Sequence, residues 1–165
     1  YEDESSEDFS GRIFGRLANQ EGRILLKSPP GMSNLAYEGF KTFIQYEGDQ
    51  RVGNCAACHT LPDFTDGRSH NVQPGMAKVP TTSLRNLNKS AQALRKIIDQ
   101  KINYAKIKQK GDAPKISDLY STIRLDQNDV TALVAFIKLL QDVPEQTFRQ
   151  LILDSKVFDP SGTPE

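Results

Sequence analysis

All cysteines and histidines of this 165-residue chain lie within sixteen positions, from Cys55 to His70. Cys55, Cys58 and His59 form the pattern C-x-x-C-H. Two thiols at this spacing can add to the two vinyl groups of one porphyrin as thioethers, and the adjacent histidine can then ligate the iron. The pattern therefore predicts one covalently bound haem c, with His59 as the proximal iron ligand.

Other uses of these four residues explain the pattern less well. A disulfide between Cys55 and Cys58 is strained and leaves His59 without a role. A thioredoxin-type redox pair needs a strand before it and a βαβ context, and the sequence indicates neither. A zinc cage would combine all four residues, but the side chains of Cys58 and His59 point apart, which suits a tetrahedral site badly. Haem attachment is the favoured interpretation.

The group on the other side of the iron distinguishes an electron carrier from a haem with an open position. Met76, in the segment QPGMAKVP, is the leading candidate because a thioether closes the site and its loop is rich in Pro and Gly. The alternative role of Met76 is to fill a gap in the core. His70 is a further candidate, since a second imidazole would lower the potential. The sequence does not decide between these two residues as the sixth ligand. Further candidates are named below, and the sixth position can also be empty.

A helix is predicted before the C-x-x-C-H motif, where it can help to position the haem-binding side chains. The segment SNLAYEGFKTFIQYEGDQ begins with Ser33, whose hydroxyl can cap a helix, and Gly48 is expected to end it. The apolar stripe of this helix comprises Leu35, Phe40, Phe43 and Ile44. Gly39 lies inside the helix, where glycine costs about 1 kcal/mol relative to alanine. We therefore expect another helix to cross closely at this glycine.

Two later segments also predict helices. The first begins after Ser90 and places on one side Leu94, Ile97, Ile98 and Ile102. The second begins after Asp126, ends before Pro144, and has an apolar face of Val130, Leu133, Val134, Phe136, Ile137 and Leu140. Residues 60–90 are rich in Pro, Gly and small polar residues, which predicts a long functional loop. No run of alternating β-branched residues appears, so the fold class is all-α with long loops.

Charge and hydropathy limit the classes of function. Lysine plus arginine equal aspartate plus glutamate at 21 each, so no overall charge favours nucleic acid. No apolar run approaches the length of about 18 residues that a membrane span needs. Charge is uneven, however, because residues 85–115 carry nine bases and two acids. Such a charge run is more often a solvated helix face, and the functional alternative is a docking face for an acidic redox partner protein.

Three segments carry a resemblance to a known family, namely CAACHTLPDFTDGRSHN, VPTTSLRN and LDQNDVTALVAFIKLL. Together they resemble the C-terminal haem domain of the bacterial di-haem cytochrome c peroxidases, and the resemblance covers about residues 37–142. The order of Gly39, Phe43, the C-A-A-C-H motif and a late apolar helix is similar to the class I cytochrome c fold. In that fold the first helix crosses the last, which implies contact between Gly39 and the region of residues 133–136.

The resemblance also implies roles for individual residues. Arg85, in the LRN segment, would contact a haem propionate or shield the haem edge, and an ion pair within its loop is the alternative. The helix after LRN would deliver the distal ligand, which adds Lys101 and Tyr104 to the candidates. The ordinary alternatives for these two are a surface lysine and a half-buried aromatic. In the family the histidine equivalent to His70 is not usually an axial ligand, so the resemblance implies a hydrogen bond within its loop instead.

The resemblance and the composition together divide the chain into three parts. Residues 1–32 are an N-terminal extension with an acidic tail over residues 1–8, residues 33–143 are a mono-haem cytochrome c domain, and residues 144–165 are a C-terminal extension. The chain opens YEDESSEDFSG, without an initiator Met or a basic-then-apolar start, which indicates a mature or trimmed product. We expect an all-α, cytochrome c-like domain around one covalently bound haem.

The departures from the family bear on function. The relatives carry two haems and an aromatic-histidine-glycine insertion after LRN, both tied to peroxidatic chemistry, whereas this chain has one attachment motif and LRNLNKSAQAL leads directly to a helix. The sequence therefore favours a carrier of single electrons between redox partners. The alternative is a peroxidase-related or gas-binding haem subunit with an open or weakly ligated iron. The resemblance implies a periplasmic or otherwise extracytoplasmic location.

Overall fold

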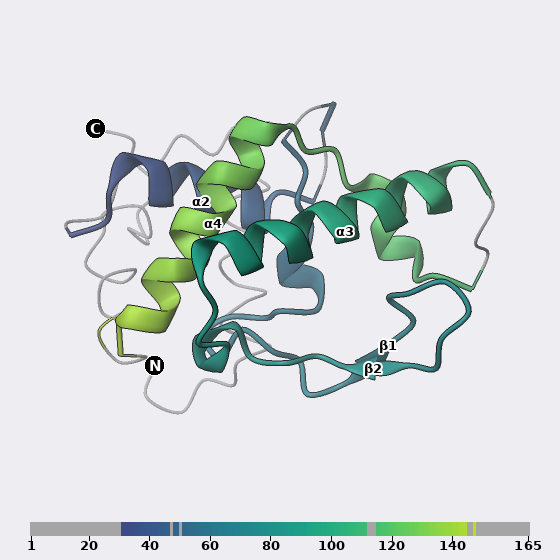
Figure 1. Cartoon of the computed structure of the whole chain (residues 1–165), viewed down its shortest axis with the longest axis horizontal. Helices are drawn as coiled ribbons and strands as arrows, with labels where there is room; N and C mark the ends of the chain where they lie inside the picture. Colours follow the sequence, from purple (N-terminus) through teal and green to yellow (C-terminus); the bar gives the residue numbers. More distant parts are fainter. Residues whose placement is uncertain (1–30, 47, 50, 112–114, 145–146, 148–165) are drawn as a thin grey trace, which may run out of the picture.

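The computed structural model describes residues 31–46, 48–49, 51–111, 115–144 and 147 (Figure 1). The helices are α2 (Asn34–Ile44), α3 (Ala91–Gln109) and α4 (Gln127–Asp142), with short 3-10 turns at Cys55–Ala57, Leu84–Asn86 and Asp118–Thr122. This helical architecture confirms the predicted fold class. Most of both predicted extensions, including the acidic tail, lies outside the described residues.

The crossing of α2 and α4 forms the main core (Figure 1). Gly39 of α2 meets the backbone of α4 so closely that a Cβ atom there would lie 2.0 Å from the carbonyl oxygen of Ala132. The predicted crossing at Gly39 is therefore confirmed. Around it, Phe136 packs its ring against Phe40 and Phe43, both at 5.3 Å between ring centroids. Glycine is needed here because any side chain would hold the helices apart.

The expected stripe of α2 is wrong in one residue. The Ser33 hydroxyl accepts a hydrogen bond from the Ala36 amide at 3.2 Å, as predicted for a cap, but the helix ends at Ile44 rather than at Gly48. Phe40, Phe43 and Ile44 are buried, whereas Leu35 is 48% exposed. Phe40 comes five positions after Leu35, which places them about 140° apart around an α-helix. Leu35 therefore faces away from α4.

The stripe of α3 also differs from expectation in one residue. Ser90 caps the helix, since its hydroxyl accepts from the Ala93 amide at 3.2 Å. Leu94 and Ile102 are buried and Ile98 packs against the core, but Ile97 is 39% exposed. The inward stripe runs through positions 94, 98, 101 and 105, and Ile97 lies beyond its edge.

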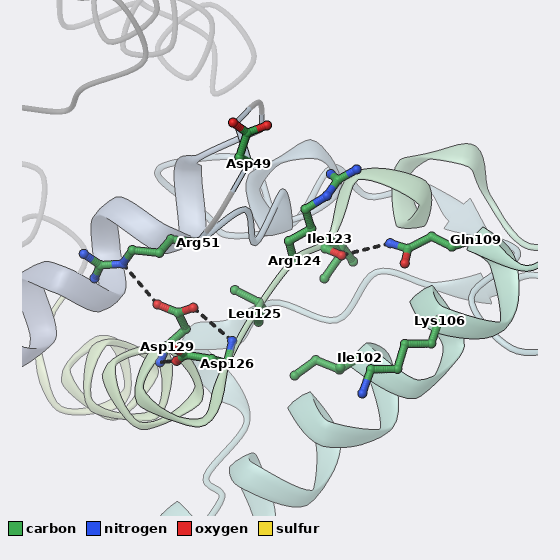
Figure 2. Close-up of a pocket in the computed structure, with 10 residues that line it drawn as sticks. All are labelled: Asp49, Arg51, Ile102, Lys106, Gln109, Ile123, Arg124, Leu125, Asp126 and Asp129. Atoms are coloured by element: carbon green, nitrogen blue, oxygen red, sulfur yellow. Dashed lines mark hydrogen bonds and ion pairs between the residues drawn. The ribbon is translucent and has the colours of Figure 1, made fainter.

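The beginning of α4 combines a cap with a partly buried ion pair. Asp126 accepts hydrogen bonds from the amides of Asn128 at 2.8 Å and Asp129 at 2.9 Å, and Asp129 accepts one from the Asp126 amide at 3.0 Å. This reciprocal capping box stabilises the first turn. The buried Asp129 carboxylate also accepts from Arg51 Nε at 3.1 Å, as Figure 2 shows. All six residues of the predicted apolar face are buried.

A small β-ribbon lies within the long loop of residues 60–90. Its strands, β1 (Ser69–His70) and β2 (Val79–Pro80), are antiparallel, with Ser69 opposite Pro80 and His70 opposite Val79. These strands were not predicted from the sequence, because they are too short to show alternation. Met76 lies between the strands, and its side chain is 62% exposed. Within the described part of the chain, no helix has the length and apolar character to cross a membrane.

Candidate haem site

Two close approaches of the backbone position the C-x-x-C-H segment. The Gly53 amide donates to the Thr42 carbonyl oxygen at 3.1 Å, and a Cβ on Gly53 would lie 2.4 Å from that oxygen. Asn54 then takes a left-handed conformation with φ of 49° and donates from its side chain to the Leu119 carbonyl oxygen at 3.0 Å. The turn that begins at Cys55 is thus held against α2 on one side and the Asp118–Thr122 turn on the other.

The two cysteines are free thiols, partly exposed, and lie in one turn. The Cys58 and His59 amides both approach the Cys55 carbonyl oxygen, at 3.3 and 2.9 Å. Burial raises the pKa of Cys55 to about 12 and that of Cys58 to about 11, so both sulfurs are uncharged at neutral pH. A thioether sulfur is also uncharged, so this environment fits covalent attachment to a porphyrin.

The His59 ring is oriented by the main chain of the following loop. Its Nδ1 lies 3.0 Å from the Phe64 carbonyl oxygen. Because a carbonyl oxygen only accepts hydrogen bonds, this contact places a proton on Nδ1. Burial lowers the pKa of His59, although hydrogen bonding to the main chain of Phe64 and of Thr82 opposes this shift. The imidazole is therefore neutral, as iron ligation requires.

The loop that orients His59 is itself tied to the LRN segment. Ser83 donates from its hydroxyl to the Asp63 carbonyl oxygen at 2.7 Å. Arg85 donates from Nε to the Pro62 carbonyl oxygen at 3.0 Å and from a terminal nitrogen to that of Val143 at 3.2 Å. Its guanidinium carbon also lies 5.3 Å from the centroid of the Phe64 ring. Arg85 therefore links the proximal loop to the end of α4, and its contact with a propionate stays a prediction.

Two apolar clusters flank the cysteines. Cys55 packs against the main core around α2 and α4. The second apolar cluster comprises Ala105, Ile116 and Tyr120, with Val72, Tyr104, Ile107 and Ile123 packed against it. Burial raises the pKa of Tyr120, and negative charge on Cys58 or Cys55 would raise it further, which places its phenol near both thiols. Apolar walls on both sides of the attachment residues suit a porphyrin.

The candidates for the sixth ligand lie in different surroundings. Met76 is exposed on the ribbon, so the structure does not bring it to the cysteines. His70 donates from Nε2 to the Asp66 carboxylate at 2.6 Å, which confirms the hydrogen bond expected within its loop. The Tyr104 hydroxyl accepts from the Gln100 side chain at 2.6 Å. Burial lowers the pKa of Lys101, and its amine is within electrostatic range of Cys58 and His59.

Among the described residues, one group of three side chains has the spacing of a metal site. Ligand atoms of Cys58, Asp66 and His70 lie within 4.8 Å of one another. This group is not the four-residue cage considered from the sequence, because Asp66 takes part and His59 does not. Haem attachment would convert Cys58 to a thioether, which removes the thiolate that zinc prefers. Asp66 was missed by sequence reasoning, although its spacing of four from His70 was visible.

The pocket in Figure 2 is a separate feature of the surface. It has a volume of about 460 Å³ and lies between α3, the beginning of α4 and the segment around Arg51. Of the described residues that line it, none belongs to the C-x-x-C-H motif. Two of its charged side chains, Arg51 and Asp129, form an ion pair at 3.1 Å. Arg51 also pairs with Glu38 of α2 at 2.8 Å, so this side chain joins α2 to α4.

The basic segment of residues 85–115 divides between the interior and the surface. Arg85 and Lys101 point inward, and Lys108 forms an ion pair with Asp118 at 2.7 Å. The exposed lysines of the segment are Lys89, Lys96, Lys106, Lys110 and Lys115. Helical spacing places positions 96, 106 and 110 on one outward side of α3 and its C-cap. We call these three residues the lysine stripe.

The comparison with protein families agrees with this geometry. Residues 38–141, more than half of the chain, match the family model described as cytochrome c. The match begins in α2, includes the C-A-A-C-H motif, and ends in α4. No curated protein and no solved structure matches the chain significantly.

Proposed function

The chain belongs to the cytochrome c family, and from this membership we propose that it transfers single electrons between redox partners outside the cytoplasm, using one covalently attached haem c. The haem supplies an iron that gains and loses one electron. The chain supplies thioether attachment through Cys55 and Cys58 and proximal ligation through His59. The observation that carries the proposal is the C-x-x-C-H turn, in which the Phe64 carbonyl oxygen orients the His59 ring through Nδ1 at 3.0 Å.

The test of this function is the state of the iron in the haem-loaded protein. We expect the reduced protein to remain six-coordinate and low-spin, and its absorption spectrum to stay unchanged when carbon monoxide is added, because a carrier keeps both axial positions filled. Oxidation and reduction by small one-electron reagents should be complete and reversible. A high-spin reduced protein that binds carbon monoxide at once would falsify the carrier function.

A second function has a specific observation in its favour. Met76 is exposed on the ribbon rather than directed to the cysteines, and a haem without a methionine ligand suits a peroxidase-related or gas-binding subunit. The resemblance of the FTD, HN and SLRN segments to the C-terminal domain of the di-haem peroxidases supports this alternative. Turnover of hydrogen peroxide with an electron donor, together with binding of carbon monoxide, would favour it over the carrier.

We further propose that the lysine stripe docks an acidic partner. The side chains of Lys96, Lys106 and Lys110 are exposed on one side of α3, and a row of like charges speeds encounter with an opposite charge. We expect oxidation of the reduced protein by ferricyanide, an anionic probe, to slow several-fold in the double variant Lys106→Glu and Lys110→Glu. Stopped-flow absorption at low ionic strength measures this rate.

The control for the stripe changes the same charge elsewhere. Arg68 and Lys78 are exposed in the loop of residues 60–90, so the double variant Arg68→Glu and Lys78→Glu alters net charge equally without touching α3. High salt should remove the difference between the two variants, because it screens exposed charges. Equal slowing in both variants at low salt would show that net charge, and not the lysine stripe, governs the encounter.

A further inference from the structure

Lys101 lies on the inward side of α3, among apolar residues. The stripe that faces the protein interior comprises Leu94, Ile98, Lys101, Ile102 and Ala105. Leu94 is at one end and Ala105 at the other, both buried, and Lys101 is half-buried between them. Lysine usually keeps its amine in water. An amine among buried apolar side chains loses hydration, so the inward position of Lys101 calls for an interaction that compensates this loss.

The Lys101 side chain reaches the surroundings of the cysteines. Its Nζ lies 5.8 Å from the centroid of the Tyr104 ring, and Tyr104 packs in the second apolar cluster with Tyr120. The amine interacts electrostatically with Cys58 and with His59. Lys101 thus faces the same apolar walls that would hold a porphyrin attached at Cys55 and Cys58.

The amine of Lys101 is also available, unlike the other candidate ligands. Within the described residues no hydrogen bond or ion pair engages it, and its ring contact is with Tyr104. The His70 imidazole and the Tyr104 hydroxyl each have a partner at 2.6 Å. Met76 lies on the exposed part of the ribbon, from which the loop would have to rearrange to reach the cysteines.

We propose that the amine of Lys101 is the distal ligand of the haem iron, opposite His59. The inference rests on haem attachment as set out under the proposed function, and adds the group that fills the sixth position. The neutral amine gives its lone pair to the iron, and its proton leaves to solvent. The helix α3 holds the amine in place by the packing of Leu94, Ile98 and Ala105 on either side of Lys101.

The test compares variants of the haem-loaded protein by absorption spectroscopy. The wild-type ferric protein should be low-spin without the weak far-red band of methionine ligation. Lys101→Ala should open the iron, so that the reduced protein binds carbon monoxide within the mixing time, whereas the wild type binds none. Adding ethylamine, a free primary amine, should restore the low-spin spectrum of Lys101→Ala. Lys101→Met should acquire the far-red band and a higher midpoint potential.

Two controls separate ligation from other effects. Met76→Ala and Lys78→Ala change exposed residues of the ribbon and should leave the spectrum and the carbon monoxide response as in the wild type. If Lys101→Ala does not incorporate haem, the appearance of the far-red band in Lys101→Met still decides the question.

The outcomes distinguish this inference from the function on which it rests. If the wild type is closed to carbon monoxide and Lys101→Ala is closed as well, Lys101 is not the ligand and the carrier function stands. Loss of a far-red band in Met76→Ala would also overturn ligation by Lys101 and would identify Met76 as the ligand instead. If the wild type itself binds carbon monoxide at once, both the carrier function and ligation by Lys101 are wrong.

Discussion

Replacing Phe136 with alanine is expected to lower the free energy of unfolding of the haem-loaded protein by about 3–5 kcal/mol. The side chain of Phe136 is fully buried, and its ring lies within 5.3 Å of the Phe40 and Phe43 rings and 6.0 Å of the Phe64 ring, between centroids. Removing it leaves a cavity at the crossing of α2 and α4, where backbone contact at Gly39 resists movement of the helices. Urea denaturation followed by circular dichroism measures the change.

The control for Phe136 is Leu35→Ala, which removes an apolar side chain that is 48% exposed. This variant should change the free energy of unfolding by about 0.5 kcal/mol or less, as surface substitutions usually do. Because the carbonyl of Phe64 orients His59 and its ring packs on Phe136, Phe136→Ala should also alter the spectrum of the haem. Equal destabilisation by the two variants would contradict the placement of the core.

Replacing Gly39 with alanine is expected to lower the free energy of unfolding by about 1–3 kcal/mol or more. This is the opposite of what the same substitution usually does inside a helix. Alanine is normally favoured over glycine within a helix by about 1 kcal/mol. Here the added Cβ would lie 2.0 Å from the Ala132 carbonyl oxygen and 2.9 Å from the Phe136 Cβ. Since backbone atoms of α4 cannot turn aside as a side chain can, the two helices must separate.

The experiment tests whether Gly39→Ala lowers or raises the free energy of unfolding. The preference of a helix for alanine over glycine must therefore be measured in the same protein. Asn103 is exposed in the interior of α3, and the difference between Asn103→Gly and Asn103→Ala gives the intrinsic preference for alanine. Urea denaturation of all three variants compares them directly. A gain in stability for Gly39→Ala, similar to the difference measured at position 103, would show that α2 and α4 are not in backbone contact at Gly39.

The features that the sequence predicted correctly depend on neighbouring residues. Ser33, Ser90 and Asp126 cap helices because each side chain reaches an amide two or three positions ahead. The C-x-x-C-H motif is equally local, and the family match includes it. The face of α4 was predicted in full because its apolar residues form a wide stripe that tolerates a small error in direction.

The features that the sequence predicted wrongly, or did not predict, depend on how elements distant in the sequence pack against one another. Leu35 and Ile97 are apolar and lie near a stripe, yet none of the described elements covers either side chain sufficiently to bury it. The ribbon of β1 and β2 pairs residues about ten positions apart in a loop whose composition indicates only turns. The ion pair between Arg51 and Asp129 joins two distant segments and left no signal in the sequence.

By itself, the sequence determined the haem chemistry, the family and the caps of the helices, because each is written in residues that are close together along the chain. The tertiary structure decided which distant side chains meet. It placed Met76 on the exposed ribbon, turned Arg85 toward the carbonyl oxygens of Pro62 and Val143, and directed Lys101 inward. The direction of a side chain from a helix or loop depends on packing against elements far away in the sequence, which no local pattern records.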